Sequence, residues 1–426
     1  LAGSLFFVSK PSFATNGDNL IGIGPASKSM GGVGIACPQD AISSIFSNPA
    51  TMSFSPYNPG SQFDFAGTVF VPSVEGSVEQ MGQLTKAQSD KKAYAIPAIG
   101  FSIPLGDEEN RWRMGLAAYG VTGLGVDYRA TDLDNAKGFD FSGGAGTGPF
   151  APLIAGEYTS LQIMKFALAV SYKLNPQISF GLSTHLNYSS LDLRGGSSFN
   201  YAFGVQPGVV YSPIENLSLG LTYSMPQNVT HSSVTDFNQD GKLDNMDLES
   251  PQQLGFGAAY RVKELNLLIE ANAKWINWSG AKGYKEFDWN DQWVFNLGAQ
   301  YQPISGLSIR AGYNYGKNPL KVHNGWDGSF NPGTGAPNSV NDVQGVKVPT
   351  YYYETFRIIG FPAIVEQHLT FGLGYQFSEK LGINFSYVHA FENTITESGS
   401  NPFGMPVKLK STLSENSFSF AMSYKF

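Results

Sequence analysis

The last ten residues of the chain, SFSFAMSYKF (Ser417 to Phe426), alternate between large apolar and small or polar side chains. Successive side chains of a β-strand point to opposite faces, so the two kinds of side chain are expected to separate. The apolar face consists of Phe418, Phe420, Met422, Tyr424 and Phe426. The other face consists of Ser419, Ala421, Ser423 and Lys425. Such a strand suits a wall with lipid on one side and a polar interior on the other.

The composition supports a membrane barrel and argues against other classes. The chain has 426 residues, of which 14% are aromatic and only 14% are charged, whereas soluble domains carry about 25% charged residues. A helical membrane protein needs runs of about 20 apolar residues, and the sequence contains no such run. A net charge of −7 argues against a nucleic-acid partner. A single cysteine, Cys37, excludes an intramolecular disulfide and a cysteine-based metal cluster.

Alternating segments follow one another from residue 62, and their separators alternate between short turns and long polar loops. This rhythm is typical of transmembrane β-barrels, whose strands span the membrane with about 9 to 11 residues. The segments are residues 62–71, 94–104, 111–122, 157–174, 177–193, 201–212, 216–226, 252–263, 265–278, 291–303, 306–316, 366–377, 381–392 and 415–426. The long connections are residues 123–156, 227–250, 317–365 and 393–414. We therefore predict an all-β fold, a 14-stranded antiparallel transmembrane β-barrel over residues 59–426, with both ends in the periplasm.

The amino-terminal residues have a different character. Residues 1–14 combine an apolar run with Ser12 and Ala14, the small-residue spacing of a secretory cleavage site, so we predict a signal-peptide remnant and export to a Gram-negative-type outer membrane. Residues 15–58 are rich in Gly, Ala and Ser and lack alternation, which predicts a hatch that plugs the lumen. Their glycines do not match a dinucleotide fingerprint, because no alternating strand precedes them.

Three stretches resemble the FadL-type family of outer-membrane transporters for long-chain fatty acids and other hydrophobic compounds. They are GIGPASKSMGGVGIACPQDAISSIFSNPA (Gly22 to Ala50), IPAIGFSIPL (Ile96 to Leu105) and RMGLAAYGVTGLGVDY (Arg113 to Tyr128). The resemblance implies passive diffusion of a fatty acid or hydrocarbon ligand through a hatch-plugged barrel in outer-membrane lipid. The aromatic last residue also resembles the signal by which the barrel-assembly machinery recognises such proteins.

The same resemblance implies roles for particular residues. The hatch and gating candidates are Gly31, Gly32, Asn48, Pro49 and Ala50, where the proline fixes a turn. In the family, substrate leaves sideways at a kinked third strand. The lateral-opening candidates here are Gly115, Gly120 and Gly123, because glycine weakens and bends a strand.

Strand parity places several charged side chains inside the barrel. Lys165, His185, Lys274 and Arg310 all face inward, and they are candidates for binding a carboxylate head group. Inward placement is also expected without any function, because Arg or Lys facing lipid near the midplane costs about 2–4 kcal/mol. An internal ion pair between Glu270 and Lys274 is a competing interpretation.

A twelve-residue loop, DFNQDGKLDNMD (Asp236 to Asp247), has the spacing of a calcium-binding loop. Gly241 occupies the sharp-turn position 6. The candidate ligands are Asp236, Asn238, Asp240, the backbone carbonyl of Lys242, Asp244 and Asp247. We therefore expect calcium to be possible in an external loop, although transport itself needs no cofactor.

Three alternatives to hydrophobic transport differ in their expected features. A general diffusion porin would have an open polar lumen and no glycine-rich plug. A binding or adhesion protein would use the long external loops. An outer-membrane enzyme is disfavoured because the sequence contains no Gly-x-Ser-x-Gly nucleophile elbow.

Overall fold

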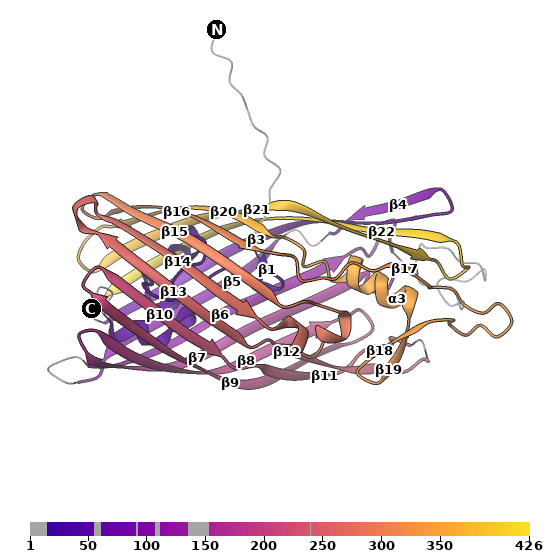
Figure 1. The fold of residues 1–426 in the computed structure, drawn as a ribbon, viewed down its shortest axis with the longest axis horizontal. Coiled ribbons are helices and arrows are strands. Elements are labelled where there is room, and N and C mark those ends of the chain that lie inside the picture. The colour runs from indigo at the N-terminus through magenta and orange to yellow at the C-terminus, as the bar shows by residue number, and fades with distance from the viewer. Residues whose placement is uncertain (1–14, 55–60, 91–92, 107–110, 135–152, 239) are drawn as a thin grey trace, which may run out of the picture.

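The computed structural model describes residues 15–54, 61–90, 93–106, 111–134, 153–238 and 240–426. Within these residues, fourteen antiparallel strands close into a barrel (Figure 1). They are β3 (Gln62–Gln80), β5 (Tyr94–Pro104), β6 (Trp112–Asp127), β7 (Tyr158–Asn175), β8 (Ile178–Asp192), β9 (Ser197–Ile214), β10 (Leu217–Ser224), β13 (Gln253–Val262), β14 (Leu267–Ile276), β15 (Gln292–Ile304), β16 (Leu307–Gly316), β20 (Gln367–Gln376), β21 (Leu381–Ser400) and β22 (Pro406–Lys425). The predicted fold class is confirmed.

The last strand, β22, closes the barrel against the first, β3. Gln62 lies opposite Lys425 in this pairing, and the hydroxyl groups of Thr68 and Ser419 lie 2.8 Å apart on the inner face. The Phe426 amide donates to the Ser61 carbonyl at 3.1 Å. Closure pairs the first and last strands of the wall, which would otherwise be open edges able to pair with another chain.

The outer surface of the barrel is a belt of apolar side chains. On β22, the five residues of the predicted apolar face are between 41% and 57% exposed, whereas Ser419, Ala421 and Ser423 are at most 8% exposed. Neighbouring strands continue this pattern with Phe385 on β21 and Phe371 on β20. An apolar belt around a closed barrel identifies a transmembrane β-barrel.

Several strands are longer than the sequence predicted. The predicted loop over residues 393–414 is wrong, because β21 continues to Ser400 and β22 begins at Pro406. The predicted loop over 227–250 contains a hairpin of β11 (Gln227–Thr235) and β12 (Asp244–Ser250), and β3 continues to Gln80, where it forms a hairpin with β4 (Gln83–Gln88). The outward residues of these extensions, such as Lys408 and Lys410, are polar, so no apolar alternation reveals the strands.

The connection from residue 317 to 365 folds over the mouth of the barrel at the end opposite the short turns, which we call the outer mouth. It contains β17 (Asn324–Trp326), β18 (Val340–Val343), β19 (Val346–Pro349), α3 (Thr350–Thr355) and a π-helical turn, η5 (Phe356–Gly360). Figure 1 shows α3, β18 and β19 at one end of the barrel and the carboxyl terminus at the other. Ile358, Ile359 and Ile364 have no exposed surface, so this connection forms part of the core.

Short 3₁₀ turns complete the two ends of the barrel. They are η2 (Lys263–Leu265), η3 (Trp278–Gly280) and η4 (Lys285–Phe287). Among the residues that the structure describes, no helix has the length and apolar character needed to cross a membrane.

Residues 15–54, which we call the hatch, lie inside the barrel and are almost entirely buried. They form β1 (Thr15–Asn16), β2 (Asn19–Leu20), α1 (Pro25–Ser29), α2 (Ala41–Ser47) and η1 (Pro49–Ser53). The expectation that no strand precedes the glycines is wrong, because β1 pairs with β2. Two residues per strand are too few to show alternation. The predicted signal segment 1–14 and residues 55–58 lie outside the described residues.

Candidate functional site

Glu270 on β14 anchors the hatch to the barrel wall. Its carboxylate accepts the backbone N–H groups of Gly34 at 3.0 Å, Ala36 at 2.9 Å and Cys37 at 3.2 Å, and the residue has no exposed surface. Consecutive backbone N–H groups that converge in this way form an anion-binding nest. The carboxylate is therefore engaged by the hatch backbone and not by Lys274.

Gly31 and Gly32 allow the hatch backbone to approach the wall closely. Both have positive φ angles, 71° and 83°, and a Cβ on Gly31 would lie 2.6 Å from the Tyr313 carbonyl oxygen on β16. A Cβ on Gly32 would lie 2.1 Å from the Ile21 carbonyl oxygen. The Gly31 amide donates to the Thr370 hydroxyl at 2.9 Å. These two positions admit only glycine without movement of the backbone.

The Asn48–Pro49–Ala50 turn joins the hatch to another part of the wall. The Asn48 amide group donates to the carbonyls of Ile35 at 2.9 Å and Val209 at 3.2 Å. Its side-chain oxygen accepts the Ala50 N–H at 3.1 Å and so caps η1. One buried side chain thus holds two hatch segments against β9.

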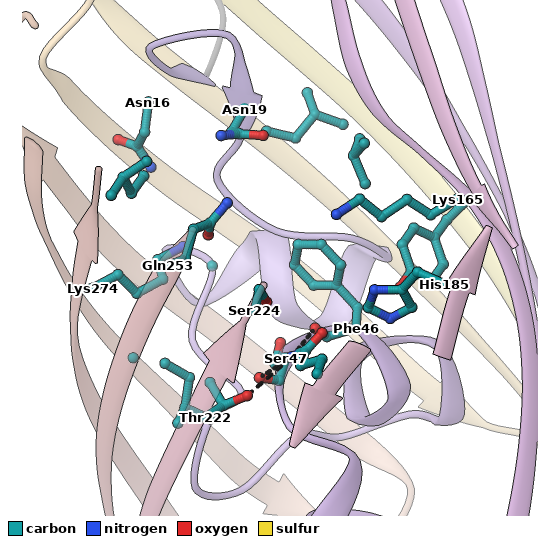
Figure 2. Close-up of a pocket in the computed structure, with 18 residues that line it drawn as sticks. Asn16, Asn19, Phe46, Ser47, Lys165, His185, Thr222, Ser224, Gln253 and Lys274 are labelled. Atoms are coloured by element: carbon teal, nitrogen blue, oxygen red, sulfur yellow. Dashed lines mark hydrogen bonds between the residues drawn. The ribbon is translucent and has the colours of Figure 1, made fainter. Parts of the chain in front are cut away.

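A cavity of about 60 Å³ lies between the hatch and the wall (Figure 2). Three of the four head-group candidates line it: Lys165 on β7, His185 on β8 and Lys274 on β14. The hatch contributes Asn16, Asn19 and Phe46, among others. In Figure 2 the two lysines approach the cavity from opposite sides.

The two lysines in this cavity are not neutralised by direct contacts. No described residue makes a hydrogen bond or ion pair with the ammonium group of Lys165 or Lys274. The acid whose charge acts on Lys165 is Asp18, and its carboxylate already accepts the Tyr284 hydroxyl. His185 lies 3.0 Å from the Ser183 hydroxyl through Nε2. The cavity can therefore bind an anion by charge-assisted hydrogen bonds.

Arg310, the fourth candidate, lies elsewhere in the barrel. Its guanidinium donates to Gln300 at 2.6 Å and to Asn384 at 2.7 Å. It lines a cavity of about 630 Å³ at the end of the barrel that carries the short turns, together with Lys425 and Glu379. Most of the other lining side chains there are amides and hydroxyls. The structure therefore separates Arg310 from the two lysines.

The pairing between β5 and β6 stops part of the way along the strands. It runs from Pro104 opposite Arg113 to Ala98 opposite Tyr119. Beyond that point Thr122 pairs with the hatch residue Asn19, and the register between β6 and β7 shifts between Gly120 and Thr122. Such a shift is a β-bulge, which bends a strand.

Two of the three lateral-opening candidates lie at this break. A Cβ on Gly120 would lie 2.6 Å from Ile96 Cγ2, and a Cβ on Gly123 would lie 4.0 Å from Ile96 Cδ1. Gly115 instead pairs with Ser102 and faces the hatch, where a Cβ would lie 2.6 Å from Met52 Sδ. The structure thus places Gly120 and Gly123 at the break and Gly115 away from it.

Sequence reasoning missed an apolar cavity in the outer mouth. It has a volume of about 20 Å³ and is lined by Leu191, Leu193, Met246, Leu248, Gly283, Phe287, Trp289, Phe356, Arg357 and Phe361. A second cavity of about 410 Å³ shares Leu193 and Phe356 with it. The residues that line the first cavity come from four separate segments, so only a concentration of aromatic residues in loops 278–289 and 350–361 could have indicated them.

The calcium candidates lie in an outer loop. Asp236 accepts the N–H groups of Asp240 at 3.0 Å and Gly241 at 2.8 Å, and Gly241 has the φ of 85° expected at the sharp turn. Asn238 accepts the Asp240 N–H, Asp240 accepts the Lys242 N–H, and Asp244 accepts the Phe237 N–H. Four candidate side chains therefore surround one turn.

Asp247 lies apart from the other calcium candidates. It is on β12, where its carboxylate accepts the Thr230 hydroxyl and pairs with Lys282 at 3.0 Å. The Thr230 hydrogen bond and the Lys282 charge hold the pKa of Asp247 below its usual value, although partial burial acts in the opposite direction. To bind calcium at position 12 of the loop, the Asp247 carboxylate would have to give up its contacts with Thr230 and Lys282.

The fold was compared with known proteins. No protein-family model and no curated protein sequence matches the chain. Among solved structures, a FadL homologue from Pseudomonas aeruginosa has a TM-score of 0.67 at 14% identity, covering 98% of this chain and 100% of that one.

Two toluene transporters are also similar. The Pseudomonas putida transporter TodX has a TM-score of 0.63 at 18% identity, covering 95% of this chain and 99% of that one. The Ralstonia pickettii transporter TbuX has a TM-score of 0.62 at 17% identity, covering 96% and 99%. At these identities the likeness establishes the fold. The chain is a fourteen-stranded barrel with the fold of the FadL homologue and the toluene transporters, as the resemblance of its glycine-rich block implied.

Proposed function

We propose that this protein is a passive outer-membrane transporter of hydrophobic molecules that carry a carboxylate, such as long-chain fatty acids. The observation that carries this proposal is the pair of unneutralised ammonium groups, Lys165 and Lys274, in a cavity next to the hatch. The apolar side chains that line the outer mouth support contact with an apolar chain, and their cavity of about 20 Å³ would have to widen to hold one. The similar solved structures, which include toluene transporters, support hydrophobic cargo in general.

Passage through the barrel requires movement of the hatch. The inner cavity is about 60 Å³, whereas an apolar cavity of about 150 Å³ is known to hold benzene. A hydrophobic molecule therefore needs more room than this state offers. The hairpin of β1 and β2 is a candidate for the moving part, because it lies beside the cavity and pairs with β6 at Thr122.

We also propose that the molecule leaves sideways between β5 and β6. The cavity at the periplasmic end is lined mainly by amides, hydroxyls and charged groups. An apolar chain that left this way would enter water, at a cost of about 25 cal/mol per Å² of exposed apolar surface. The pairing of β5 with β6 instead stops at Ala98 opposite Tyr119, and a molecule that left through the wall at this point would enter lipid, where no such cost arises.

Uptake by intact cells tests the transport function. We expect a Gram-negative host that lacks its own fatty-acid channel to take up labelled oleate when it makes this protein. Liposomes that contain the protein should remain closed to a small sugar such as arabinose, because the hatch fills the lumen. Passage of arabinose without oleate uptake would instead favour a general porin.

Loss of the Glu270 carboxylate is expected to loosen the hatch. In Glu270→Ala, three buried hatch N–H groups lose their acceptor, and each unsatisfied group costs about 1–3 kcal/mol. Liposomes that contain this variant should therefore admit arabinose. Glu264→Ala, in the exposed turn that precedes β14, is the matched control and should stay closed. A closed Glu270→Ala barrel would show that other contacts hold the hatch.

We further propose that the outer loop binds calcium through Asp236, Asn238, Asp240, Asp244 and the carbonyl of Lys242. Millimolar calcium is expected to slow hydrogen exchange over residues 230–250, because the ion would link oxygens of several side chains around this turn. Asp236→Asn should remove this effect. Asp342→Asn, in another exposed acidic turn, should leave it unchanged. Equal exchange with and without calcium would contradict the proposal.

A further inference from the structure

The outer mouth contains a buried ionic cluster around Arg357, whose side chain has no exposed surface. Its Nε donates to the Phe287 carbonyl at 2.9 Å, and its Nη2 donates to the Lys321 carbonyl at 2.6 Å. Its Nη1 donates to the carboxylates of Glu354 and of Glu397, at 2.5 and 3.1 Å. The guanidinium therefore uses every nitrogen to hold a different neighbour.

His323 completes the cluster. Its Nδ1 lies 2.8 Å from a Glu354 oxygen and 3.0 Å from Arg357 Nη1. A histidine and two carboxylates within reach of one another could in principle hold a divalent metal. Here Arg357 Nη1 already lies between all three groups, so the guanidinium is the cation of this site.

Arg357 joins parts of the chain that are far apart in sequence. Phe287 belongs to η4, Lys321 and His323 belong to the chain before β17, and Glu397 is on the outer part of β21. Further contacts hold the same segment, since the Tyr353 hydroxyl donates to the Glu286 carbonyl and the Tyr351 hydroxyl donates to the Leu153 carbonyl. The cluster thus fastens residues 350–360 to the rim of the barrel.

Residues 350–360 also form part of the wall of the outer apolar cavity. Phe356 and Arg357 line that cavity from η5, and Phe361 follows directly. We propose that Arg357 is the latch of a gate: it holds residues 350–360 in the outer mouth, and a hydrophobic molecule reaches the lumen when this segment moves outward. This inference rests on the proposed transport function.

The charges of the latch are unbalanced. Two carboxylates, Glu354 and Glu397, face one guanidinium, and they lie close enough to repel each other. The Glu397 Oε2 atom is buried and has no hydrogen-bond partner among the described residues. The neighbouring Asp288 adds a third negative charge, which Lys321 offsets at 3.3 Å. The repulsion between Glu354 and Glu397 therefore acts against the attraction of each carboxylate to Arg357.

This imbalance predicts opposite effects for two variants. Arg357→Gln removes the guanidinium that contacts both glutamates, so residues 350–360 should open more often. Breaking a buried ion pair in this way is expected to speed amide hydrogen exchange in this segment by roughly 100-fold. Glu397→Gln keeps an oxygen that accepts from Arg357 and adds an N–H group that can donate to Glu354. The repulsion between the two carboxylates is then removed, so amide hydrogen exchange of residues 350–360 should slow severalfold.

The experiment compares exchange and uptake in the same variants. Exchange of residues 350–360 is measured by mass spectrometry on the full chain in detergent, and oleate uptake is measured in cells. Lys347→Gln, which breaks an exposed ion pair with Asp342 in the same connection, is the matched control and should change neither. We expect uptake to rise in Arg357→Gln and to fall in Glu397→Gln.

The outcomes separate the gate from the transport function. If exchange changes as expected but uptake by both variants equals that of the wild type, the gate is overturned and transport stands. If the wild type takes up no oleate, the transport function fails, and the exchange data alone report on the latch. If Arg357→Gln does not fold, Glu397→Gln decides, and exchange equal to or faster than wild type overturns the latch.

Discussion

Oxidation of a double-cysteine variant, Ile96→Cys with Gly120→Cys, is expected to abolish oleate uptake. A Cβ on Gly120 would lie 3.9 Å from the Cβ of Ile96, within the range of about 3.5–4.5 Å that disulfides adopt. The bond would tie β5 to β6 at the point where their pairing stops. If the hydrophobic molecule leaves through this break, the crosslink closes its exit.

The reduced form of the same variant is the first control for this experiment. Uptake should return on reduction, because the bond is the only difference between the two forms. Cys37 is replaced by serine in all variants to exclude a wrong pairing, and Gly120→Cys alone shows the effect of the added side chain. Wild-type uptake by a variant whose thiols are fully oxidised would show that the molecule leaves by another route.

The double variant Lys165→Met with Lys274→Met is expected to lose oleate binding. Each hydrogen bond to a charged group contributes about 1.5–3 kcal/mol, so the loss of both should weaken binding by about 100-fold or more. Methionine keeps the length and the apolar stem of lysine, which limits damage to the cavity. Equilibrium binding of labelled oleate to the purified protein measures the effect.

Two comparisons assign this loss to the head group. Toluene has no carboxylate, so its binding should stay within about twofold of the wild type in the double variant. Arg310→Gln should leave oleate binding nearly unchanged, because Arg310 lines a separate cavity at the end of the barrel that carries the short turns and already donates to Gln300 and Asn384. Unchanged oleate affinity in the lysine variant would instead favour a neutral hydrocarbon as the cargo.

Strand parity was the most reliable guide to this fold. Each barrel strand has one face toward lipid and one toward the lumen, so the outward aromatic residues of β22 and the inward Lys165 and Glu270 were all placed correctly from the sequence. The same rule failed beyond the lipid belt. There the outward side chains of β21 and β22 are polar, and the strands continue without an apolar signal.

The contents of the lumen were harder to predict. Parity predicts that a side chain points into the lumen. The path of the hatch through the lumen determines which groups that side chain contacts. Glu270 has Lys274 four residues away in sequence, yet its carboxylate binds the hatch backbone. Arg310 and Lys165 both point inward, yet they line separate cavities.

Periodicity and composition alone determined that this chain forms a closed, lipid-facing barrel with a small-residue segment at its beginning. The alternation along each strand could be read from the sequence because it depends only on whether each side chain faces the lipid or the lumen. The tertiary structure decided the pairing of Lys165 with Lys274 across one cavity, the break at Gly120 and the buried cluster at Arg357. Each of these depends on segments that lie far apart in sequence and meet only when the barrel closes around the hatch.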